Sequence, residues 1–433
     1  MAALDHLKKN DDAIPRGMHR PHDVTHGLRL VRGQGSWVWD EQGRRYLDWT
    51  SSFSSLNFGH AHPELIRVAY EQLQTLPHVT GIATPWRDEL IQSLAKRAPF
   101  PQAKAWLSTT GSRAIEIAWK VATMRRPGAI VSFDQGFHGK SIAVSSLSAT
   151  PRVPFLNAAL ASLTHSEQRY PFCGECPWSR VPSTCSIECA DDIESWLDHH
   201  AENVSAFVIE PWAGARGYLR ARNEFYQRLR AKTLELGIAL IADEIQTGLG
   251  RLGSIWACEQ QGWIPDLLVI GKSLGGGLLP ISAVLGPSSW LDLLDPGIES
   301  ETFAADPIGC RIGLQVLEWL TPQFFEQASQ RGELLRQSLQ QTLERHGLLS
   351  RVHLEGEGCL AILHWTTQQA SNPSSCALQF AQCAMQHGVL VHRTGPCGNR
   401  IVILPSLLVT TDEIQEGVTS LERALLQVFQ SLD

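Results

Sequence analysis

The sequence lacks the features of membrane, secreted and nucleic-acid-binding proteins. None of its 433 residues lies in an apolar run of about eighteen residues, which a membrane-spanning helix would need. The net charge of −7 leaves no excess of basic residues for a nucleic acid. The N-terminal stretch MAALDHLKKNDDAIPRG is polar and has no apolar core of a secretory signal. We therefore expect a cytoplasmic protein that binds small molecules and neither membranes nor nucleic acids.

Disulfide bonds are not expected either, although the chain has ten cysteines, because the cytoplasm keeps thiols reduced. Four cysteines lie close in sequence, at Cys173, Cys176, Cys185 and Cys189, and could in principle bind zinc tetrahedrally. Their spacing, Cys-x2-Cys-x8-Cys-x3-Cys, does not closely match a common zinc module. We adopt the plainer interpretation, a proline-rich surface loop with partly buried thiols and no metal.

What the sequence does contain is an alternation of strands and helices. Short apolar runs at residues 129–133, 206–211, 238–244 and 266–272 are separated by segments with helical periodicity. Strands this apolar are typical of a parallel sheet covered by helices on both faces. Near the start of the chain, apolar–polar alternation around a turn at residues 40–43 predicts a β-hairpin.

The length of the chain exceeds what one hydrophobic core usually fills, so at least two domains are expected. From about residue 325, amphipathic helices surround one predicted strand, RIVILP. We predict an α/β fold with a large domain and a mainly parallel sheet at residues 62–324. A smaller α+β domain is predicted from the two chain ends, residues 1–61 and 325–433.

Three groups of polar residues fall at the ends of predicted strands, where open α/β sheets bind their ligands. The first group, Ser108-Thr109-Thr110-Gly111-Ser112, leads into a helix. Its hydroxyls and free backbone N–H groups are suited to a phosphate. Capped helix starts are common in proteins, so this group alone says little about function.

The second group begins with Asp243, directly after the apolar strand IALIA. A buried carboxylate needs a cationic partner, and no arginine or lysine adjoins Asp243 within its strand. A protonated pyridine nitrogen would serve as that partner. The aspartate would then make the pyridine ring an electron sink for a substrate carbanion.

The third group centres on Lys272, which ends the strand DLLVI and precedes a glycine-rich turn. Desolvation in this setting should lower the pKa of the ammonium and leave a nucleophilic amine, as Schiff-base chemistry requires. A single strand-end lysine is more often a solvated surface residue. The unpartnered Asp243 earlier in the chain favours a cofactor site instead.

Longer motifs extend these three groups and resemble a known family. DEIQTGLGRLG and PDLLVIGKSLGGGLLPISAV resemble the signature of class III aminotransferases, fold-type I pyridoxal-phosphate enzymes that include ornithine and 4-aminobutyrate aminotransferases. The resemblance covers nearly the whole chain through VWDEQGRRYLD, FGHAHPEL, FDQGFHGKS, FVIEP, ETFAADPIGC and LPSLLVTTDEI. It implies pyridoxal 5'-phosphate as the cofactor and a homodimer with a composite active site.

The resemblance also implies roles for individual residues. Lys272 would carry the cofactor as a Schiff base and shuttle the α-proton, while Asp243 would pair with the pyridine nitrogen. Gln246 would lie near the ring hydroxyl, and Phe137 would stack on the ring. The remaining implied cofactor contacts are Gly111 and Ser112 at the phosphate, Thr302 at the phosphate of the neighbouring subunit, Glu210 near the site, and His138, for which a packing role is equally open.

The chain departs from the family where the substrate carboxylate is bound. Most members have an arginine at the position of Val402, and many have a glutamate, which pairs with that arginine, at the position of Ala215. Losing both together avoids an unpaired buried charge. Arg400, on the same strand face as Val402, could supply a replacement guanidinium, as could Arg216 beside Ala215. Each of these two arginines could instead be a solvated surface residue. Lys140 could bind a distal carboxylate.

A further departure is Arg113, where the family usually has a glutamate, and it could add a cation near the phosphate. The sequence as a whole predicts an aminotransferase that moves an amino group from an amine or amino acid, with the ω-amino and diamino acids as candidates, to an oxo acid or aldehyde. An amino-acid racemase or epimerase on the same scaffold remains an alternative. A non-catalytic dimer with a regulatory role is another.

Overall fold

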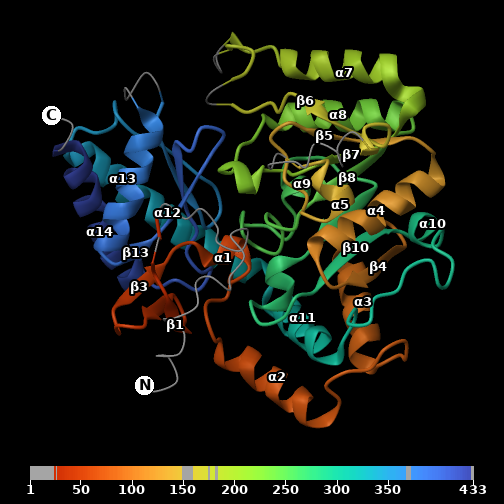
Figure 1. Cartoon of the computed structure of the whole chain (residues 1–433), viewed down its shortest axis with the longest axis horizontal. Coiled ribbons are helices and arrows are strands. Elements are labelled where there is room, and N and C mark those ends of the chain that lie inside the picture. Colours follow the sequence, from red (N-terminus) through yellow and green to blue (C-terminus); the bar gives the residue numbers. More distant parts are fainter. Residues whose placement is uncertain are drawn as a thin grey trace.

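A seven-stranded sheet forms the centre of the structure (Figure 1). The structure is a computed structural model, and it describes residues 24–25, 27–148, 159–173, 176–180, 184–366 and 372–430. The strands are β4 (Ala103–Ser108), β5 (Ala129–Phe133), β6 (Thr164–Gln168), β7 (Val204–Ile209), β8 (Ala239–Asp243), β9 (Leu267–Ile270) and β10 (Ser282–Pro287). They lie in the order β4-β10-β9-β8-β7-β5-β6, and only β10 runs antiparallel to its neighbours within this sheet. The predicted α/β fold with a mainly parallel sheet is confirmed, and the four apolar runs match strands to within two residues.

Helices cover both faces of this sheet because its strands are apolar on both sides. Along β7, Ala206 and Val208 pack in one apolar cluster with residues of α4, whereas Phe207 and Ile209 pack in another with residues of α8 and α11. The helices of this part of the chain are α2 (Pro63–Thr75), α3 (Pro85–Arg97), α4 (Gly111–Arg125), α5 (Ile142–Ser145), α7 (Glu188–His200), α8 (Asn223–Glu235), α9 (Ala257–Gln260), α10 (Ser288–Leu291) and α11 (Pro307–Trp319).

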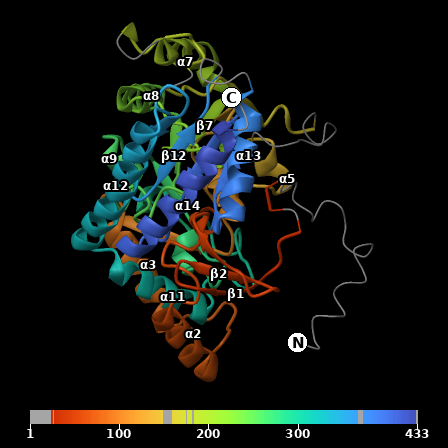
Figure 2. The ribbon, with the colours of Figure 1, turned by 90° about the vertical axis from the view of Figure 1, so that its left-hand side faces the viewer.

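A second body of structure combines residues from both ends of the chain. Its strands are β1 (Leu30–Gln34), β2 (Trp37–Asp40), β3 (Arg45–Asp48), β11 (His353–Glu355), β12 (Ala361–His364), β13 (Val389–Leu390), β14 (His392–Thr394) and β15 (Arg400–Ile403). Its helices are α12 (Pro322–Arg345), α13 (Pro373–Gln386) and α14 (Thr411–Gln430), which Figure 2 shows side by side. β2 and β3 form the predicted hairpin, and β3 pairs in parallel with β13.

The two chain ends also share one apolar core. Leu47 and Trp49 from the N-terminal side pack in the same cluster as Leu335, Phe380 and Leu421 from the C-terminal side. This packing is consistent with a small domain made from both ends. The domain boundaries at residues 61 and 325 themselves stay a prediction.

A buried arginine joins the two bodies. The Arg251 guanidinium donates to the backbone carbonyls of Cys359 and Pro405, both at 2.8 Å, and to the side chain of Asn57. Its partners therefore come from the N-terminal segment and from two C-terminal segments. Because hydrogen bonds offset part of the cost of burying this charge, the three segments that accept from Nη1 and Nη2 are fixed against the loop that follows β8.

The four clustered cysteines lie near α7, and all ten cysteines are free thiols. Cys173 is exposed and the other three are partly buried. Burial, together with the neighbouring thiols, raises the pKa of Cys189 to about 12. Within the described ranges no three metal-ligating side chains are close enough together to hold a metal ion. Residues 174–175 and 181–183 of the predicted loop lie outside those ranges.

The helices that the structure describes include none that is long and apolar enough to span a bilayer.

The contact between the chain ends leads to a first prediction, at Gly417 in α14. A Cβ at this position would overlap the indole ring of Trp49, which is fully buried. Gly417→Ala would gain up to about 1 kcal/mol of helix propensity, but overpacking a closed core costs about 1–3 kcal/mol. We expect a net loss of about 1–2 kcal/mol in the free energy of unfolding, measured by urea denaturation. Gln415→Ala, on the exposed face of α14, is the control, and an unchanged midpoint for Gly417→Ala would contradict the prediction.

Candidate active site

The carboxyl ends of β8 and β9 bring two of the predicted site residues together. Asp243 is the last residue of β8 and pairs with Val269 of β9, and Lys272 begins the 3-10 turn η7 (Lys272–Gly275) just beyond β9. The Lys272 Nζ donates a 2.6 Å hydrogen bond to the Oε1 of Gln246, which lies in the loop after β8. Parallel pairing of two consecutive strands therefore places the amine and the carboxylate at one edge of the sheet.

The amine of Lys272 is desolvated, as the sequence predicted. Burial lowers its pKa from 10.5 to about 8, although the negative charges of Glu210 and Asp243 oppose that effect. Its backbone is also unusual, because φ is +45°, in the left-handed region that non-glycine residues rarely adopt. Such a conformation costs roughly 1–3 kcal/mol and is retained where the surrounding structure enforces it.

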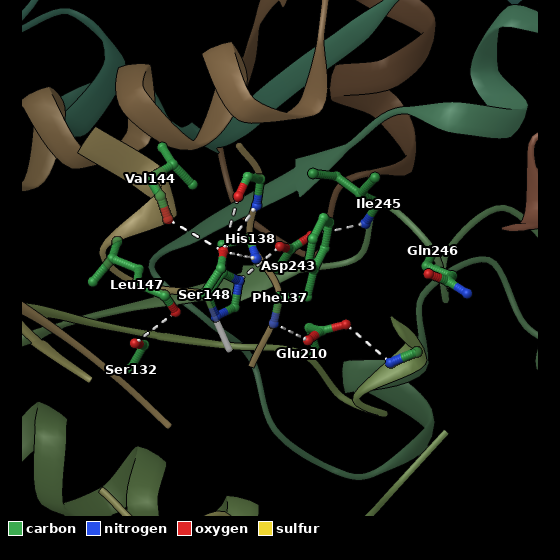
Figure 3. Close-up of polar contacts among 12 residues, drawn as sticks. Ser132, Phe137, His138, Val144, Leu147, Ser148, Glu210, Asp243, Ile245 and Gln246 are labelled. Carbon is green, nitrogen blue, oxygen red and sulfur yellow. Dashed lines mark hydrogen bonds and ion pairs between the residues drawn. The ribbon is translucent and has the colours of Figure 1, made fainter. Parts of the chain in front are cut away.

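The carboxylate of Asp243 is almost fully buried and is held from two sides. Its Oδ2 lies 2.8 Å from the Nδ1 of His138, and its Oδ1 accepts a 3.1 Å hydrogen bond from the backbone N–H of Ile245 (Figure 3). The backbone N–H of His138 in turn donates to Ser148 at 2.9 Å. His138 thus contacts the aspartate directly, and the carboxylate still has lone pairs for a further donor.

Glu210 organises the other side of the site. Its Oε1 accepts from the backbone N–H of Phe137 at 2.9 Å, and its Oε2 accepts from that of Gly214 at 3.0 Å (Figure 3). Burial raises the pKa of Glu210 to about 7, and the nearby Asp243 adds to the increase. Glu210 therefore fixes the loop that carries Phe137 and His138 relative to the segment after β7.

The helix start predicted to hold a phosphate is the N-terminus of α4, which begins at Gly111. A Cβ on Gly111 would lie 2.6 Å from the Cδ1 of Ile245, so a larger residue would require the side chain of Ile245 to move. The Ser112 Oγ accepts a 3.2 Å hydrogen bond from the backbone N–H of Lys140. Gly111 and Ser112 therefore lie between the loops that carry Ile245 and His138.

Arg113 does not add an unpaired cation near the phosphate position, contrary to the suggestion from the sequence. Its guanidinium pairs with Glu116 at 3.0 Å and with the buried Glu299, and Glu301 lies 3.9 Å away. Glu301 in turn accepts hydrogen bonds from Thr109. Three carboxylates surround the arginine, so its charge serves to hold the segment at residues 299–301 against α4.

Thr302 follows that segment and is exposed. Its backbone carbonyl accepts a 3.0 Å hydrogen bond from Thr80. In the described part of this single chain, no hydrogen bond joins Thr302 to Lys272, Asp243 or Ser112. Its position is therefore separate from the other candidate residues of its own chain.

The arrangement fits pyridoxal 5'-phosphate. It offers an amine of lowered pKa on Lys272, a buried carboxylate on Asp243 and a helix N-terminus opened by Gly111. These groups suit, in turn, a carbonyl carbon, a protonated ring nitrogen and a phosphate.

Comparisons with known proteins agree with this arrangement. The sequence model of the family described as aminotransferase class-III matches residues 18–425. The chain belongs to the class III aminotransferase family. A 5-aminovalerate aminotransferase from Pseudomonas aeruginosa is 32% identical over 423 residues, covering 96% of each chain. A 4-aminobutyrate aminotransferase from Escherichia coli is 31% identical over 422 residues, covering 95% of this chain and 96% of the relative.

A solved structure agrees as well. The crystal structure of an amine transaminase from an uncultivated Pseudomonas species, in its PLP-bound form, has a TM-score of 0.84 at 26% identity and covers 96% of this chain and 98% of its own. The chain is therefore a fold-type I enzyme, a pyridoxal-phosphate-dependent aminotransferase, as the sequence predicted. This membership sets aside the non-catalytic dimer, and nothing in the comparisons supports a racemase.

The position of the usual carboxylate-binding arginine of class III aminotransferases is apolar in this chain. Val402 is buried in a cluster with Trp212, Tyr218 and Leu404. Arg400 does lie on the same strand face, as predicted, but its Nε donates to the Gly217 carbonyl at 3.0 Å and its Nη2 pairs with Glu355. The guanidinium is thus already engaged within the protein.

The other two predicted substrate contacts differ from Arg400 in their surroundings. Lys140 is exposed at the edge of the site. Arg216 is half-buried at the end of the 3-10 turn η6 (Gly214–Arg216), the segment that contacts Glu210. Their roles in substrate binding remain predictions.

Two residues of the site were not found by sequence reasoning. The Tyr218 hydroxyl accepts from the Gln246 Nε2 at 3.2 Å and lies 3.2 Å from the Ser54 Oγ. No local pattern marks them, because three distant segments of the chain meet at this point.

Glu244 is the neighbour of Asp243 but has a structural role. Its carboxylate accepts a 2.8 Å hydrogen bond from the backbone N–H of Cys258.

The lowered pKa of Lys272 predicts how the enzyme without cofactor captures pyridoxal phosphate. Only the neutral amine attacks a carbonyl, and the neutral fraction rises as pH increases through about 8. An unperturbed lysine with a pKa of 10.5 would be neutral in only about one molecule in three hundred at pH 8. We expect the capture rate, followed by the absorbance of the Schiff base, to level off above pH 9. A rate that still rises tenfold per pH unit between pH 9 and 10 would contradict this.

Proposed function

We propose that Lys272 is the residue that carries pyridoxal phosphate as a Schiff base and moves the proton at the substrate carbon. The observation that supports this most is the partly buried amine of Lys272, with its pKa near 8, beside the buried Asp243. The cofactor, when bound, supplies an electron sink for the substrate carbanion. Asp243 would hold the proton on the ring nitrogen, and the contact from His138 would keep the aspartate in place.

The other candidate residues would position the ring. Phe137, whose backbone is held by Glu210, would stack on it, and Gln246, which accepts from Lys272, would lie near its hydroxyl. Gly111 and Ser112 at the start of α4 would bind its phosphate. Each assignment follows the matching position of the family motif.

We propose an ω-amino acid or diamino acid as the amino donor and an oxo acid or aldehyde as the acceptor. Relatives named for 5-aminovalerate and 4-aminobutyrate support the donor class. The apolar cluster around Val402, where most members have an arginine, argues against the usual way of holding the α-carboxylate of 2-oxoglutarate. The substrate should therefore be bound differently from that of most class III aminotransferases.

We further propose a homodimer in which Thr302 completes the phosphate site of the partner. Large apolar side chains are exposed beside it: Phe303 is 62% exposed and Ile82 is 67% exposed. Ile66, Tyr70 and Leu73 form an exposed apolar stripe on α2. Exposed apolar patches of this kind mark protein interfaces.

We also propose a cytoplasmic location. The free thiols support a reducing compartment of this kind.

The role of Lys272 can be tested by replacement. Lys272→Ala should abolish the Schiff-base absorbance and lower the amino-transfer rate by roughly 10²–10⁴-fold or more, because the proton transfer is lost. The wild-type enzyme, mixed with donor amine alone, should convert bound pyridoxal phosphate into pyridoxamine phosphate in a single turnover. Exchange of the α-hydrogen with solvent without that conversion would point to a racemase. Unchanged absorbance in Lys272→Ala would place the cofactor elsewhere.

The composite site can be tested with mixed dimers. Lys272→Ala and Thr302→Val homodimers are each expected to be impaired. If Thr302 acts in the partner's site, dissociation and reassociation of the two variants gives mixed dimers with one intact site, and about a quarter of wild-type activity returns. If Thr302 acts only in its own chain, no intact site forms and no activity returns. Mixing two samples of Lys272→Ala is the control.

A further inference from the structure

Arg216 is a half-buried cation that has no counter-ion among the residues that the structure describes. Its Nε atom is buried, and among the residues that the structure describes it has no hydrogen-bond partner. No carboxylate in the described ranges forms an ion pair with the Arg216 guanidinium either. Burial lowers the pKa of this guanidinium, and the more distant charges of Asp134 and Glu210 oppose the effect. An arginine in such a place needs an anion from elsewhere.

The nearby carboxylates are held by other groups. Both oxygens of Glu210 accept hydrogen bonds from backbone N–H groups, those of Phe137 and Gly214. The Oδ1 of Asp134 accepts from the backbone N–H of Tyr170 at 2.8 Å. These carboxylates fix the loops around the site, so the donors of Arg216 stay available for a ligand.

The segment that carries Arg216 adjoins the cofactor-binding residues. A Cβ on Gly214 would lie 2.5 Å from the side-chain carbon Cδ of Gln246, and Tyr218 contacts the same glutamine from the other end of the segment. Gln246 in turn accepts from Lys272. Gly214 and Tyr218 both contact Gln246, and Arg216 is two residues from each of them in sequence. Arg216 therefore lies close to the glutamine that contacts the amine of Lys272.

Arg400, the other arginine considered for the substrate carboxylate, instead stabilises the backbone of this segment. It donates to the carbonyl of Gly217, and a Cβ on Gly217 would lie only 2.8 Å from its Cδ. Its charge is matched by Glu355. Arg400 thus supports the backbone next to Arg216, and it has a counter-ion that Arg216 lacks.

We infer that Arg216 binds the carboxylate of the substrate, an inference that rests on the proposed function. Arg216 would replace the arginine that most class III aminotransferases have at the position of Val402. The substrates would then be amines and oxo compounds that carry a carboxylate. A guanidinium can hold such a carboxylate through two parallel hydrogen bonds. The guanidinium that is absent at Val402 is thereby supplied by the residue that follows Ala215.

Binding without chemistry gives the first test. Pentanoate, a carboxylate with no amino group, is titrated calorimetrically into the holoenzyme. Arg216→Gln should weaken its binding by about 10- to 100-fold, the loss of charge-assisted hydrogen bonds, and Arg216→Lys should restore part of it. Arg222→Gln is the matched control, because that nearby arginine is paired with Glu224 at 2.8 Å. Equal binding by wild type and Arg216→Gln would overturn the inference.

Turnover gives the second test. The single-turnover reaction is compared for 5-aminovalerate and 4-aminobutyrate against pentylamine and butylamine, which lack the carboxylate. Arg216→Gln should raise the apparent dissociation constant for the amino acids by about 10- to 100-fold and change that for the amines less than about twofold. A similar loss for both classes would indicate a structural role, and a selective loss in Lys140→Gln alone would assign the carboxylate to Lys140. Either result would overturn the inference.

The two tests separate this inference from the proposed function. If no amine converts the cofactor in the wild type, amino transfer as proposed fails. Pentanoate binding still decides the role of Arg216 in that case. An unfolding midpoint of Arg216→Gln equal to that of the wild type shows that any loss of binding is local.

Discussion

The parallel pairing of β8 with β9 is the constraint on which the proposed active site depends. It ends two apolar strands at the same edge of the sheet, with Asp243 on one and Lys272 just past the other. Both side chains owe their properties to burial. Desolvation lowers the pKa of Lys272, and it makes the carboxylate of Asp243 require a cationic partner, which neither side chain would show in water. The apolar character of the strands therefore creates the polar chemistry at their ends.

The surrounding structure serves to keep this edge fixed. His138 and Ile245 hold the carboxylate of Asp243, and Glu210 fastens the loop of Phe137 to the segment after β7. The buried Arg251 ties the loop after β8 to both chain ends. Residues far from each other in sequence thus stabilise one small region. The left-handed backbone at Lys272 lies in this same region, and such a conformation persists only where the surrounding structure enforces it.

The departures from other class III aminotransferases are balanced in charge. Arg113, where the family usually has glutamate, is matched by Glu116, Glu299 and Glu301. At the substrate side, Val402 and Ala215 remove an ion pair together and leave an apolar cluster. Arg216 is the exception, since it is half-buried and no described residue pairs with it. Because Arg216 also lies close in sequence to the residues that contact Gln246, it is the place where we infer that a ligand binds.

The sequence by itself determined the sheet and the position of Asp243 and Lys272 at one edge of it. Apolar runs define buried strands locally, and strand ends in an open α/β sheet gather at one edge, so Asp243 and Lys272 could be placed together without a structure. It could not determine contacts between distant segments. Tyr218 on Gln246, Glu301 on Thr109 and the counter-ions of Arg113 each depend on how loops fold over the sheet. The same holds for the two arginines that the sequence left equal. Tertiary packing gives Arg400 its partner Glu355 and leaves Arg216 without one in the described part of the chain, because ion pairing depends on distance in space and not along the chain.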